Sequence, residues 1–399
     1  MESKGVQGKL VLFGAGKIGR SFIGQLFGRG GYEVVFVDIF KPVIDELNKR
    51  GQYNVIICEE ERTTITVSNV RAVWTEDRDE VIHEVATADI VAVSVGLAGL
   101  KGAIPMIAEA LQVRYKDANA APLDVIIAEN IRNGAEYVAG ELRPLLPSDF
   151  PLEERVGLIE TSIGKMVPIM TKADMEADIL QVFAEAYDSL ILDKKGFKNP
   201  IPPIEGLAPK EHIKAWVDRK LFIHNLGHAT TAYWGYYYHP KATYLWEVLE
   251  DERIYKAARA TMTQAAALLL KQYPGEFTLE ALTDHIDDLL HRFRNKALGD
   301  TVFRVGCDLK RKLSAEDRVA GAIHLALRLN MPYDQILRTL VVGCHFRAVD
   351  ESGNMLSSDK EFETIYRRGL SEVMTTISGF DPTADAELIN NAIEIDRTP

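Results

Sequence analysis

Short apolar runs alternate with amphipathic stretches through the first half of the sequence. This alternation predicts a parallel sheet with helices on both faces, because consecutive parallel strands need a connection long enough to hold a helix. A stretch rich in β-branched residues, 55–67, is expected to form a small inserted hairpin. The expected strands of the parallel sheet are Lys9–Phe13, Val34–Val37, Ile90–Val95, Val125–Ala128 and Gly157–Ile159.

The composition changes in the run KNPIPPIEGLAP, Lys198–Pro209, whose prolines would interrupt a helix or a central strand. Beyond it the apolar residues have a helical period, as in Ile254–Gln272 and Leu279–Phe293. We therefore expect an α/β protein of two domains. A Rossmann-type, doubly wound parallel sheet is expected over residues 1–203, and a mostly α-helical domain over residues 204–399.

A glycine-rich loop connects the first expected strand to an amphipathic helix. In dinucleotide-binding loops of this pattern the first glycine allows a tight turn, the second lets the backbone approach a pyrophosphate, and the third lets the helix pack on the strand. The helix N-terminus then presents free N–H groups to the phosphates. The alternative is that the glycines serve only the folding of a βαβ unit. The expected cofactor-binding residues are Gly14, Ala15, Gly16, Lys17, Ile18 and Gly19.

The second expected strand leads into Asp38, about twenty residues after the glycines, where an acid accepts hydrogen bonds from the adenosine ribose. The next residue is Ile39 rather than an arginine, so a 2′-phosphate would meet a carboxylate without an adjacent cation. Lys41 is the nearest positive charge further along the chain. The pattern favours NAD over NADP as the cofactor.

Composition disfavours several kinds of partner. The formal net charge is −12, whereas nucleic acids and anionic membranes attract basic surfaces. The sequence has no apolar run long enough to span a bilayer and no secretory signal at its start, so a cytoplasmic protein is expected. The 3 cysteines are widely separated and have no nearby histidine cluster, so no metal site is expected. A monomer or small homo-oligomer that binds a small molecule fits these observations.

The segment DRKLFIHNLGHATTAYWG in the second expected domain contains the candidate catalytic residues. On an α-helix Lys220, Asn225 and His228 fall within an arc of about 140 degrees, so all three can face one cleft. Oxidation of a secondary alcohol by hydride transfer needs a base for the hydroxyl proton and donors for the developing carbonyl oxygen. These side chains can divide those tasks. The same spacing is equally consistent with a non-catalytic interpretation, in which the lysine is a solvated surface charge and the histidine is a residue of the core.

The pattern K-x-x-x-x-N-x-x-H resembles the motif of the polyol-specific long-chain dehydrogenases, the mannitol dehydrogenase family. The sequence is most similar to the short members of that family, the mannitol-1-phosphate 5-dehydrogenases. This resemblance implies a metal-independent, NAD-dependent oxidoreductase that interconverts D-mannitol 1-phosphate and D-fructose 6-phosphate. The other matching segments are FGAGKIGRSFIG at the start, AENIRNG at Ala128–Gly134, RKLSAEDR at Arg311–Arg318 and HFR at His345–Arg347.

The resemblance also implies roles for individual residues. Lys220 resembles the general base of the family, and His228 resembles the residue that orients the substrate. Asn130 and Asn225 resemble the pair of amides that hydrogen-bond the substrate oxygen. Asn130 follows an expected strand, where asparagine also serves as a turn residue.

One departure from the family bears on the substrate. After the strand expected at Gly157–Ile159, relatives commonly have an acid followed by an arginine at the end of an S-x-x-D-R sequence. This sequence has Gly164 in place of the acid, which helps to bind the polyol in relatives, and Lys165 in place of the arginine. An unphosphorylated polyol or a hexuronate is therefore the alternative substrate. A non-catalytic NAD-binding protein is a separate alternative, from a different functional class.

A phosphorylated substrate needs cations, and arginine suits a phosphate because its planar group donates two hydrogen bonds at once. The resemblance places Arg311, Lys312 and Arg347 near the substrate cleft, and we expect them to bind the phosphate. A solvated basic turn is the alternative interpretation of these residues.

Overall fold

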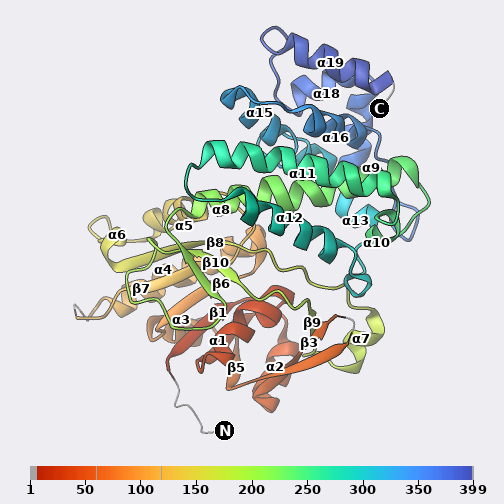
Figure 1. Ribbon diagram of the computed structural model, residues 1–399. Helices are drawn as coiled ribbons and strands as arrows, with labels where there is room; N and C mark the ends of the chain where they lie inside the picture. The colour runs from red at the N-terminus through yellow and green to blue at the C-terminus, as the bar shows by residue number, and fades with distance from the viewer. Residues whose placement is uncertain (1–6, 60, 118, 398–399) are drawn as a thin grey trace. The chain divides into compact units, whose positions relative to one another are not determined.

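The computed structural model describes residues 7–59, 61–117 and 119–397 (Figure 1). Contacts between Cα atoms divide the chain into two compact units, unit 1 (Met1–Val217) and unit 2 (Asp218–Pro399). The expected boundary between residues 203 and 204 precedes β11 (Leu207–Lys210), which pairs with the sheet of unit 1. The proline-rich run thus leads into an edge strand, where a proline is tolerated because one side of the strand needs no partner.

An eight-stranded sheet with the order β11-β10-β8-β7-β6-β1-β2-β5 lies at the centre of unit 1. All neighbours from β8 to β5 are parallel, β10 is antiparallel to β8, and β11 is parallel to β10. The other strands of the sheet are β1 (Lys9–Phe13), β2 (Glu33–Asp38), β5 (Val70–Trp74), β6 (Ile90–Val93), β7 (Leu123–Ile127), β8 (Val156–Ser162) and β10 (Leu190–Asp193). Each strand expected for the parallel sheet is present, whereas β5, β10 and β11 were not expected.

The expected hairpin is present as β3 (Gln52–Cys58) and β4 (Arg62–Ser68). These two strands are antiparallel, and β3 also pairs in parallel with β9 (Val182–Ala184) to form a three-stranded sheet. The hairpin was predictable because its residues are close in sequence. The addition of β9 was not, because this strand is short and distant along the chain.

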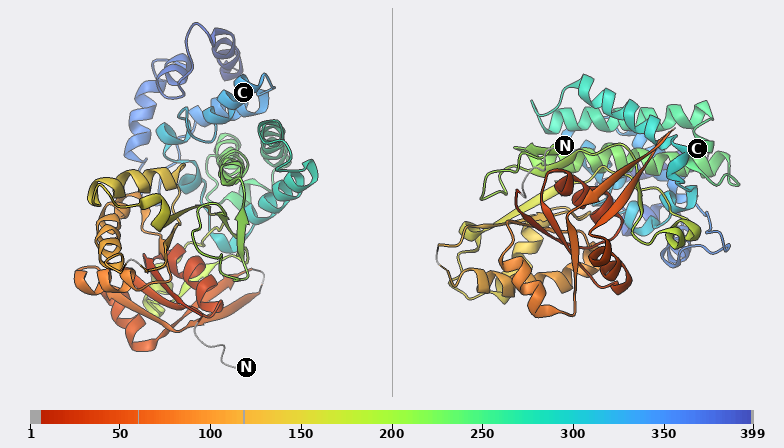
Figure 2. Two further views of the ribbon diagram at one scale, coloured as in Figure 1. Left: turned by 90° about the vertical axis from the view of Figure 1, so that its left-hand side faces the viewer. Right: turned by 90° about the horizontal axis from the view of Figure 1, so that it is seen from below.

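Both faces of the large sheet are buried, as the alternation along β1 shows. Leu10 and Leu12 pack into one apolar cluster with residues of η1, α1, α2 and the small sheet. Val11 and Phe13 pack into a second cluster with residues of α3, α4 and α5. Figures 1 and 2 show the strands of the large sheet as one twisted layer with helices on its two sides. The expected Rossmann-type architecture is confirmed.

The helical segments of unit 1 lie between its strands along the chain. They are η1 (Gly19–Gly24), α1 (Gln25–Arg29), α2 (Lys41–Arg50), α3 (Arg78–Ala86), α4 (Gly96–Arg114), α5 (Gly134–Leu142), η2 (Arg143–Leu145), α6 (Leu152–Arg155) and α7 (Lys172–Ala177), and α8 (Ile213–Arg219) leads into unit 2.

Unit 2 is almost entirely helical in the part of the chain that the structure describes, with a single isolated β-bridge between Tyr244 and Thr301. Its helix α9 packs against α11, α13 and α16, and α11 packs against α12 (Figure 1). Two helices expected from the sequence are confirmed, α11 and α12. The segments are η3 (Lys220–Asn225), α9 (Leu226–Tyr238), α10 (Leu245–Val248), α11 (Glu252–Gln272), α12 (Leu279–Phe293), η4 (Lys296–Leu298), α13 (Val302–Gly306), α14 (Leu309–Lys312), α15 (Ala320–Leu329), α16 (Asp334–Cys344), α17 (Ser357–Tyr366), α18 (Leu370–Thr376) and α19 (Ala386–Arg397).

Among the helices of the described ranges, none combines the length and the apolar character that a membrane span requires.

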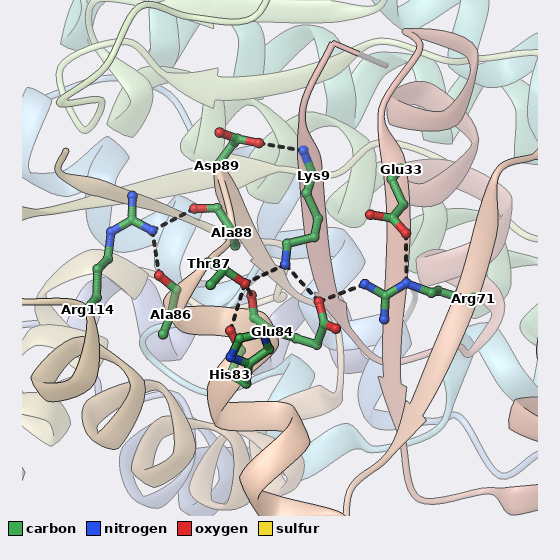
Figure 3. Close-up of polar contacts among 10 residues, drawn as sticks. All are labelled: Lys9, Glu33, Arg71, His83, Glu84, Ala86, Thr87, Ala88, Asp89 and Arg114. Carbon is green, nitrogen blue, oxygen red and sulfur yellow. Dashed lines mark hydrogen bonds and ion pairs between the residues drawn. The ribbon is translucent and has the colours of Figure 1, made fainter. Parts of the chain in front are cut away.

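A charged network fastens α3 to the sheet (Figure 3). The Glu84 carboxylate accepts hydrogen bonds from Lys9 on β1 and from Arg71 on β5, both at 2.8 Å. Arg71 also donates to Glu33 on β2, at 2.7 Å. Burial alone would raise the pKa of Glu84, but its two cationic partners lower the pKa to about 2. The carboxylate therefore stabilises the fold wherever it is ionised.

We predict that Glu84→Gln destabilises the protein by about 2 kcal/mol at pH 7, since a lowered carboxyl pKa reports stability gained in the ionised state. The wild-type advantage is complete above the ordinary glutamate pKa of 4.5 and is lost as the pH falls toward 2. Urea denaturation at pH 7 and at a pH below 4.5 measures this difference. Glu80→Gln, on the exposed side of the same helix, serves as the control. An equal loss at both pH values would contradict the prediction.

Candidate active site

The glycine loop after β1 has a conformation that only glycine allows at two positions. Gly14 has φ of +100°, and a Cβ there would lie 2.2 Å from the Ser94 carbonyl oxygen. A Cβ on Gly19 would lie 1.9 Å from the Gly14 carbonyl oxygen, so the helix approaches the loop closely because Gly19 has no side chain. Gly16 faces open space, with no atom within 4 Å of its would-be Cβ.

The open space at Gly16 fits a dinucleotide pyrophosphate, which needs backbone N–H groups without a side chain in front of them. The helix after the loop begins at Lys17, whose side chain is exposed, and Ile18 packs against the core. The predicted cofactor residues therefore lie together at the carboxyl end of β1, where Gly16 and Lys17 are exposed and the residues on either side are buried or half-buried.

Asp38 ends β2 and holds this loop in place. One of its carboxylate oxygens accepts a hydrogen bond from the Ala15 N–H at 2.7 Å, and the other accepts one from the Phe40 N–H at 2.8 Å. Each oxygen keeps a second lone pair for a ribose hydroxyl. Ile39 and Phe40 beside it are 80% and 54% exposed, so apolar surface suited to a flat base adjoins the carboxylate.

A half-buried carboxylate, Glu129, and a buried one, Glu160, hold the loop that contains Asn130. Glu129 accepts hydrogen bonds from the N–H groups of Val95 and Gly96, at 2.6 and 2.8 Å, and thereby links the loop after β7 to the loop after β6. On β8, Glu160 accepts hydrogen bonds from the backbone of Asn133 and Gly134. Burial raises the pKa of Glu160 to about 6, and the nearby Glu136 acts in the same direction. Asn130 itself is exposed, and it lies between Glu129 and the Asn133–Gly134 backbone that these hydrogen bonds hold.

In unit 2, the segment of the K-x-x-x-x-N motif is a π-helix rather than an α-helix. Residues Lys220–Asn225 form η3, which continues directly into α9 with His228. A π-helix closes its backbone hydrogen bonds between residues i and i+5, so residues four and five apart lie over one another. Lys220 and Asn225 therefore share a face more closely than an α-helix would allow.

Lys220 lies in an environment that disfavours its charged form. Burial is the main cause, and the positive charge of Arg318 is the second; together they lower the pKa of Lys220 to about 8. Arg318 is buried and donates to Asp317 at 2.8 Å. It also reaches the Asn225 carbonyl oxygen, at 3.5 Å. The segment RKLSAEDR is thus joined to η3 through its last arginine.

His228 is held by α12 and by the segment before α13. Its ring stacks on Phe293 with a centroid distance of 4.6 Å and an interplanar angle of 13°. Its Nε2 lies 3.0 Å from an Asp300 carboxylate oxygen, although the geometry of this contact is not that of a hydrogen bond. Asp300 also pairs with Arg304. Burial, followed by the charges of Arg304 and Lys312, lowers the pKa of His228 well below its ordinary value, so the ring is neutral.

The three cations predicted for a phosphate differ in their surroundings. Arg311 pairs with Asp308 and Asp317, at 2.5 and 3.0 Å. Arg347 donates to the carbonyl oxygens of Cys344 and Phe346 and lies 3.9 Å from Glu363.

Lys312 is 6% exposed and donates to the Val305 carbonyl oxygen at 2.6 Å. None of the described carboxylates forms a salt bridge with it. Burial, with the charge of Arg318, lowers the pKa of Lys312 to about 8.

Two family models match nearly the whole chain. The mannitol dehydrogenase Rossmann domain matches residues 8–206, and the mannitol dehydrogenase C-terminal domain matches residues 212–385. The chain belongs to the mannitol dehydrogenase family. Within the described residues no group of three or more histidine, cysteine, aspartate or glutamate side chains could hold a metal ion.

Solved structures of this architecture include relatives of low sequence identity. A D-sorbitol dehydrogenase in substrate-free form is 17% identical, has a TM-score of 0.81, and matches 99% of this chain and 94% of its own. The mannitol 2-dehydrogenase of Pseudomonas fluorescens, in a ternary complex with NAD and D-mannitol, is 16% identical, has a TM-score of 0.78, and matches 99% of this chain and 92% of its own. At such identity the comparison establishes the shared fold.

Four further residues of unit 2 surround the predicted catalytic residues, and sequence analysis did not identify them as part of the site. They are His224, Phe293, Asp300 and Arg318. His224 could have been found, because it lies four residues after Lys220 on the same helix. The others come from distant segments, and no local pattern indicates their contacts.

The departure at Gly164 has no steric cause. A Cβ there would meet the Tyr187 hydroxyl at 3.5 Å, an ordinary contact, so a side chain could be accommodated. The neighbouring Lys165 is buried and has its Nζ 5.2 Å from the centroid of the Phe22 ring.

The loop geometry predicts that substitutions of two glycines affect different properties, stability for Gly19 and dinucleotide binding for Gly16. Gly19→Ala should lower the thermal midpoint of unfolding, because the new methyl group would overlap the Gly14 carbonyl. Gly16→Ala should leave the midpoint unchanged and weaken dinucleotide binding by at least about tenfold, since the methyl group would occupy the space a pyrophosphate needs. Differential scanning fluorimetry and NADH fluorescence titration measure the two effects. Unaltered NADH binding by Gly16→Ala would contradict the placement of the phosphates.

Proposed function

We propose that the protein is an NAD-dependent mannitol-1-phosphate 5-dehydrogenase that interconverts D-mannitol 1-phosphate and D-fructose 6-phosphate. The observation that carries the proposal is the lysine at the start of η3, whose pKa is lowered to about 8 by burial beside Arg318. A lysine in this state can accept a proton near neutral pH, as a general base must.

The chemistry divides between the cofactor and the side chains. Bound NAD supplies the hydride acceptor. Lys220 takes the proton of the substrate hydroxyl, and the Asn225 amide donates to the oxygen that becomes a carbonyl. Neutral His228, fixed by Phe293 and Asp300, orients the substrate through a ring nitrogen. Asn130 keeps its predicted role as a second amide donor to the substrate oxygen.

The phosphate part of the proposal is supported by the charges around His228. Lys312 is buried with a carbonyl oxygen as its hydrogen-bond acceptor, and Arg304 and Arg318 act electrostatically on the same histidine. A buried ammonium without a carboxylate partner costs free energy that an anionic ligand would offset. We therefore favour Lys312 over Arg311 and Arg347 as the principal phosphate contact.

The choice of NAD is supported by Asp38. Its carboxylate is fixed by the Ala15 and Phe40 backbone and repels a 2′-phosphate. Lys41 is engaged with Asp45 at 2.6 Å and lies over the Trp74 ring, so it has partners other than a cofactor.

A panel of substrates tests the proposal. Mannitol 1-phosphate, mannitol, sorbitol and a hexuronate are incubated with NAD or NADP, and NADH or NADPH absorbance is followed. Mannitol 1-phosphate with NAD is expected to give the highest kcat/KM. Equal use of mannitol would favour the unphosphorylated polyol as the substrate. NADH binding without turnover of any substrate would favour the non-catalytic alternative.

The pH profile tests Lys220. In the oxidation direction kcat/KM should rise as the pH passes through about 8, because the base acts only after its ammonium has lost a proton. In the reduction direction the same ionisation should lower the rate. Lys220→Ala should reduce turnover by roughly a hundredfold or more and remove this ionisation from the profile, with NADH binding retained. A profile that is flat between pH 6.5 and 9.5 would refute the assignment.

The phosphate contact is tested with two lysines of the same short helix. Lys312→Met should weaken the binding of fructose 6-phosphate by about 1.5–3 kcal/mol, the range for a charge-assisted hydrogen bond, and should barely change the weaker reaction with fructose. Lys310→Met is the control, because Lys310 is paired with Glu361 at the surface. Arg311→Met and Arg347→Met are expected to have smaller effects. A uniform loss with both sugars would assign Lys312 to folding.

A further inference from the structure

A neutral histidine lies one π-helical turn from Lys220. His224 is 6% exposed, and its ring lies 6.1 Å from the His228 ring and 5.7 Å from the Phe293 ring, measured between centroids. Burial lowers the pKa of His224 well below its ordinary value, and His228, Arg292, Lys220 and His285 contribute in the same direction. No described protein group forms a hydrogen bond with this imidazole.

The His224 ring nitrogens are therefore available to a group other than the described protein. A neutral imidazole has one N–H donor and one nitrogen acceptor, and buried polar groups of this kind are paired with protein, water or ligand. Since the described protein groups supply no such bond, the ring is suited to bind water or a transferred proton. Its position four residues after Lys220 in a π-helix places it over the lysine.

A second histidine, His285, is close enough to act electrostatically on His224 and is partly exposed. His285 lies on α12, two turns before Phe293, and α12 packs against η3. It is half-buried, and burial, with the charges of Arg219 and Arg292, lowers its pKa to about 3. The described residues form no hydrogen bond with it either. Both rings are therefore neutral at the pH where Lys220 titrates, and each can accept a proton on one nitrogen while it donates from the other.

We propose that His224 and His285 form a proton relay that carries the proton from Lys220 to solvent during polyol oxidation. This inference rests on the proposed role of Lys220 as the base. Without an exit, the protonated lysine would remain in a site that disfavours its charge, and the next turnover would have no base. The route lies within unit 2.

In the first step of the relay, an N–H bond of the Lys220 ammonium breaks, and a new N–H bond forms on the free ring nitrogen of His224. The N–H bond on the opposite nitrogen of His224 breaks, and its proton passes directly or through a water molecule to His285, which releases its own proton to solvent in the same manner. Lys220 is left neutral, and the rings return to their first tautomer by rotation. Because the charged form of either ring is disfavoured, the transfers are concerted.

The first test needs no substrate. The holoenzyme with NAD, labelled with 15N-histidine, is titrated from pH 6.5 to 9.5 by NMR. The ring signals of His224 and His285 should both shift with a midpoint at about 8, the pKa of Lys220. These shifts should vanish in Lys220→Met, and the signal of exposed His291 on the same helix should stay constant. A His285 signal that does not respond to Lys220 would overturn the relay, whatever substrate the enzyme uses.

The second test is kinetic and uses His224→Gln and His285→Gln, since an amide keeps polarity but does not relay protons. Each variant should lower kcat for oxidation by at least about tenfold, with KM changed by less than about twofold, and should raise the solvent deuterium isotope effect. Added imidazole buffer should restore part of the rate. The matched control, His291→Gln, should behave as wild type.

Unchanged kcat and isotope effect in both variants would overturn the proposal. So would a loss of rate that accompanies a lower thermal midpoint and does not respond to imidazole, because that pattern indicates a packing role. If the wild-type enzyme oxidises no polyol or polyol phosphate, the proposed function fails, and the NMR titration alone decides whether the histidines are coupled to Lys220.

Discussion

The chemistry proposed for unit 2 depends on the desolvation of the Lys220 ammonium. Burial removes water from this charged group and shifts it toward its neutral form. Arg318 reinforces the shift, and it cannot turn away because Asp317 and the Asn225 carbonyl hold its guanidinium. The reactivity proposed for the lysine is therefore a property of the packed helices around it, and the fold maintains it without any ligand.

Unit 1 uses carboxylates for a different purpose. Asp38, Glu129 and Glu160 each accept hydrogen bonds from backbone N–H groups in the loops at the carboxyl ends of the strands. Such loops have few apolar contacts to fix them, and a charged acceptor gives stronger hydrogen bonds than a neutral one. Part of the negative charge of the chain thus orders the surface on which the cofactor is proposed to bind. In unit 2, Arg304, Lys312 and Arg318 act together electrostatically on His228.

Local sequence patterns predicted the regular part of the fold well. The strands of the parallel sheet, the β3–β4 hairpin and helix α12 were predictable because apolar periodicity reports burial directly. The strands β5, β10 and β11 were missed, since their positions depend on pairing with distant segments and β11 contains a proline.

The candidate site was only partly predictable, for the same physical reason. A motif of nine residues contains Lys220, Asn225 and His228, and the structure brings them onto one continuous helix. The residues that set their protonation states and orientations, among them Arg318 and Phe293, come from other helices. Their contacts follow from tertiary packing, which no single segment encodes. Nothing in the residues themselves indicated that the motif would adopt a π-helix.

The π-helical segment also limits how this sequence can evolve. A π-turn differs from an α-helix by one additional residue in the turn, so the spacing of five between the lysine and the asparagine is tied to the backbone conformation between them. Deletion of one residue from Lys220–Asn225 would restore α-helical bonding and rotate the preceding helix relative to α9. Point substitutions can alter the chemistry of the individual side chains, but a change in length there would displace the lysine from its partners at once. The segment is therefore expected to vary in composition among descendants of this sequence and to keep its length.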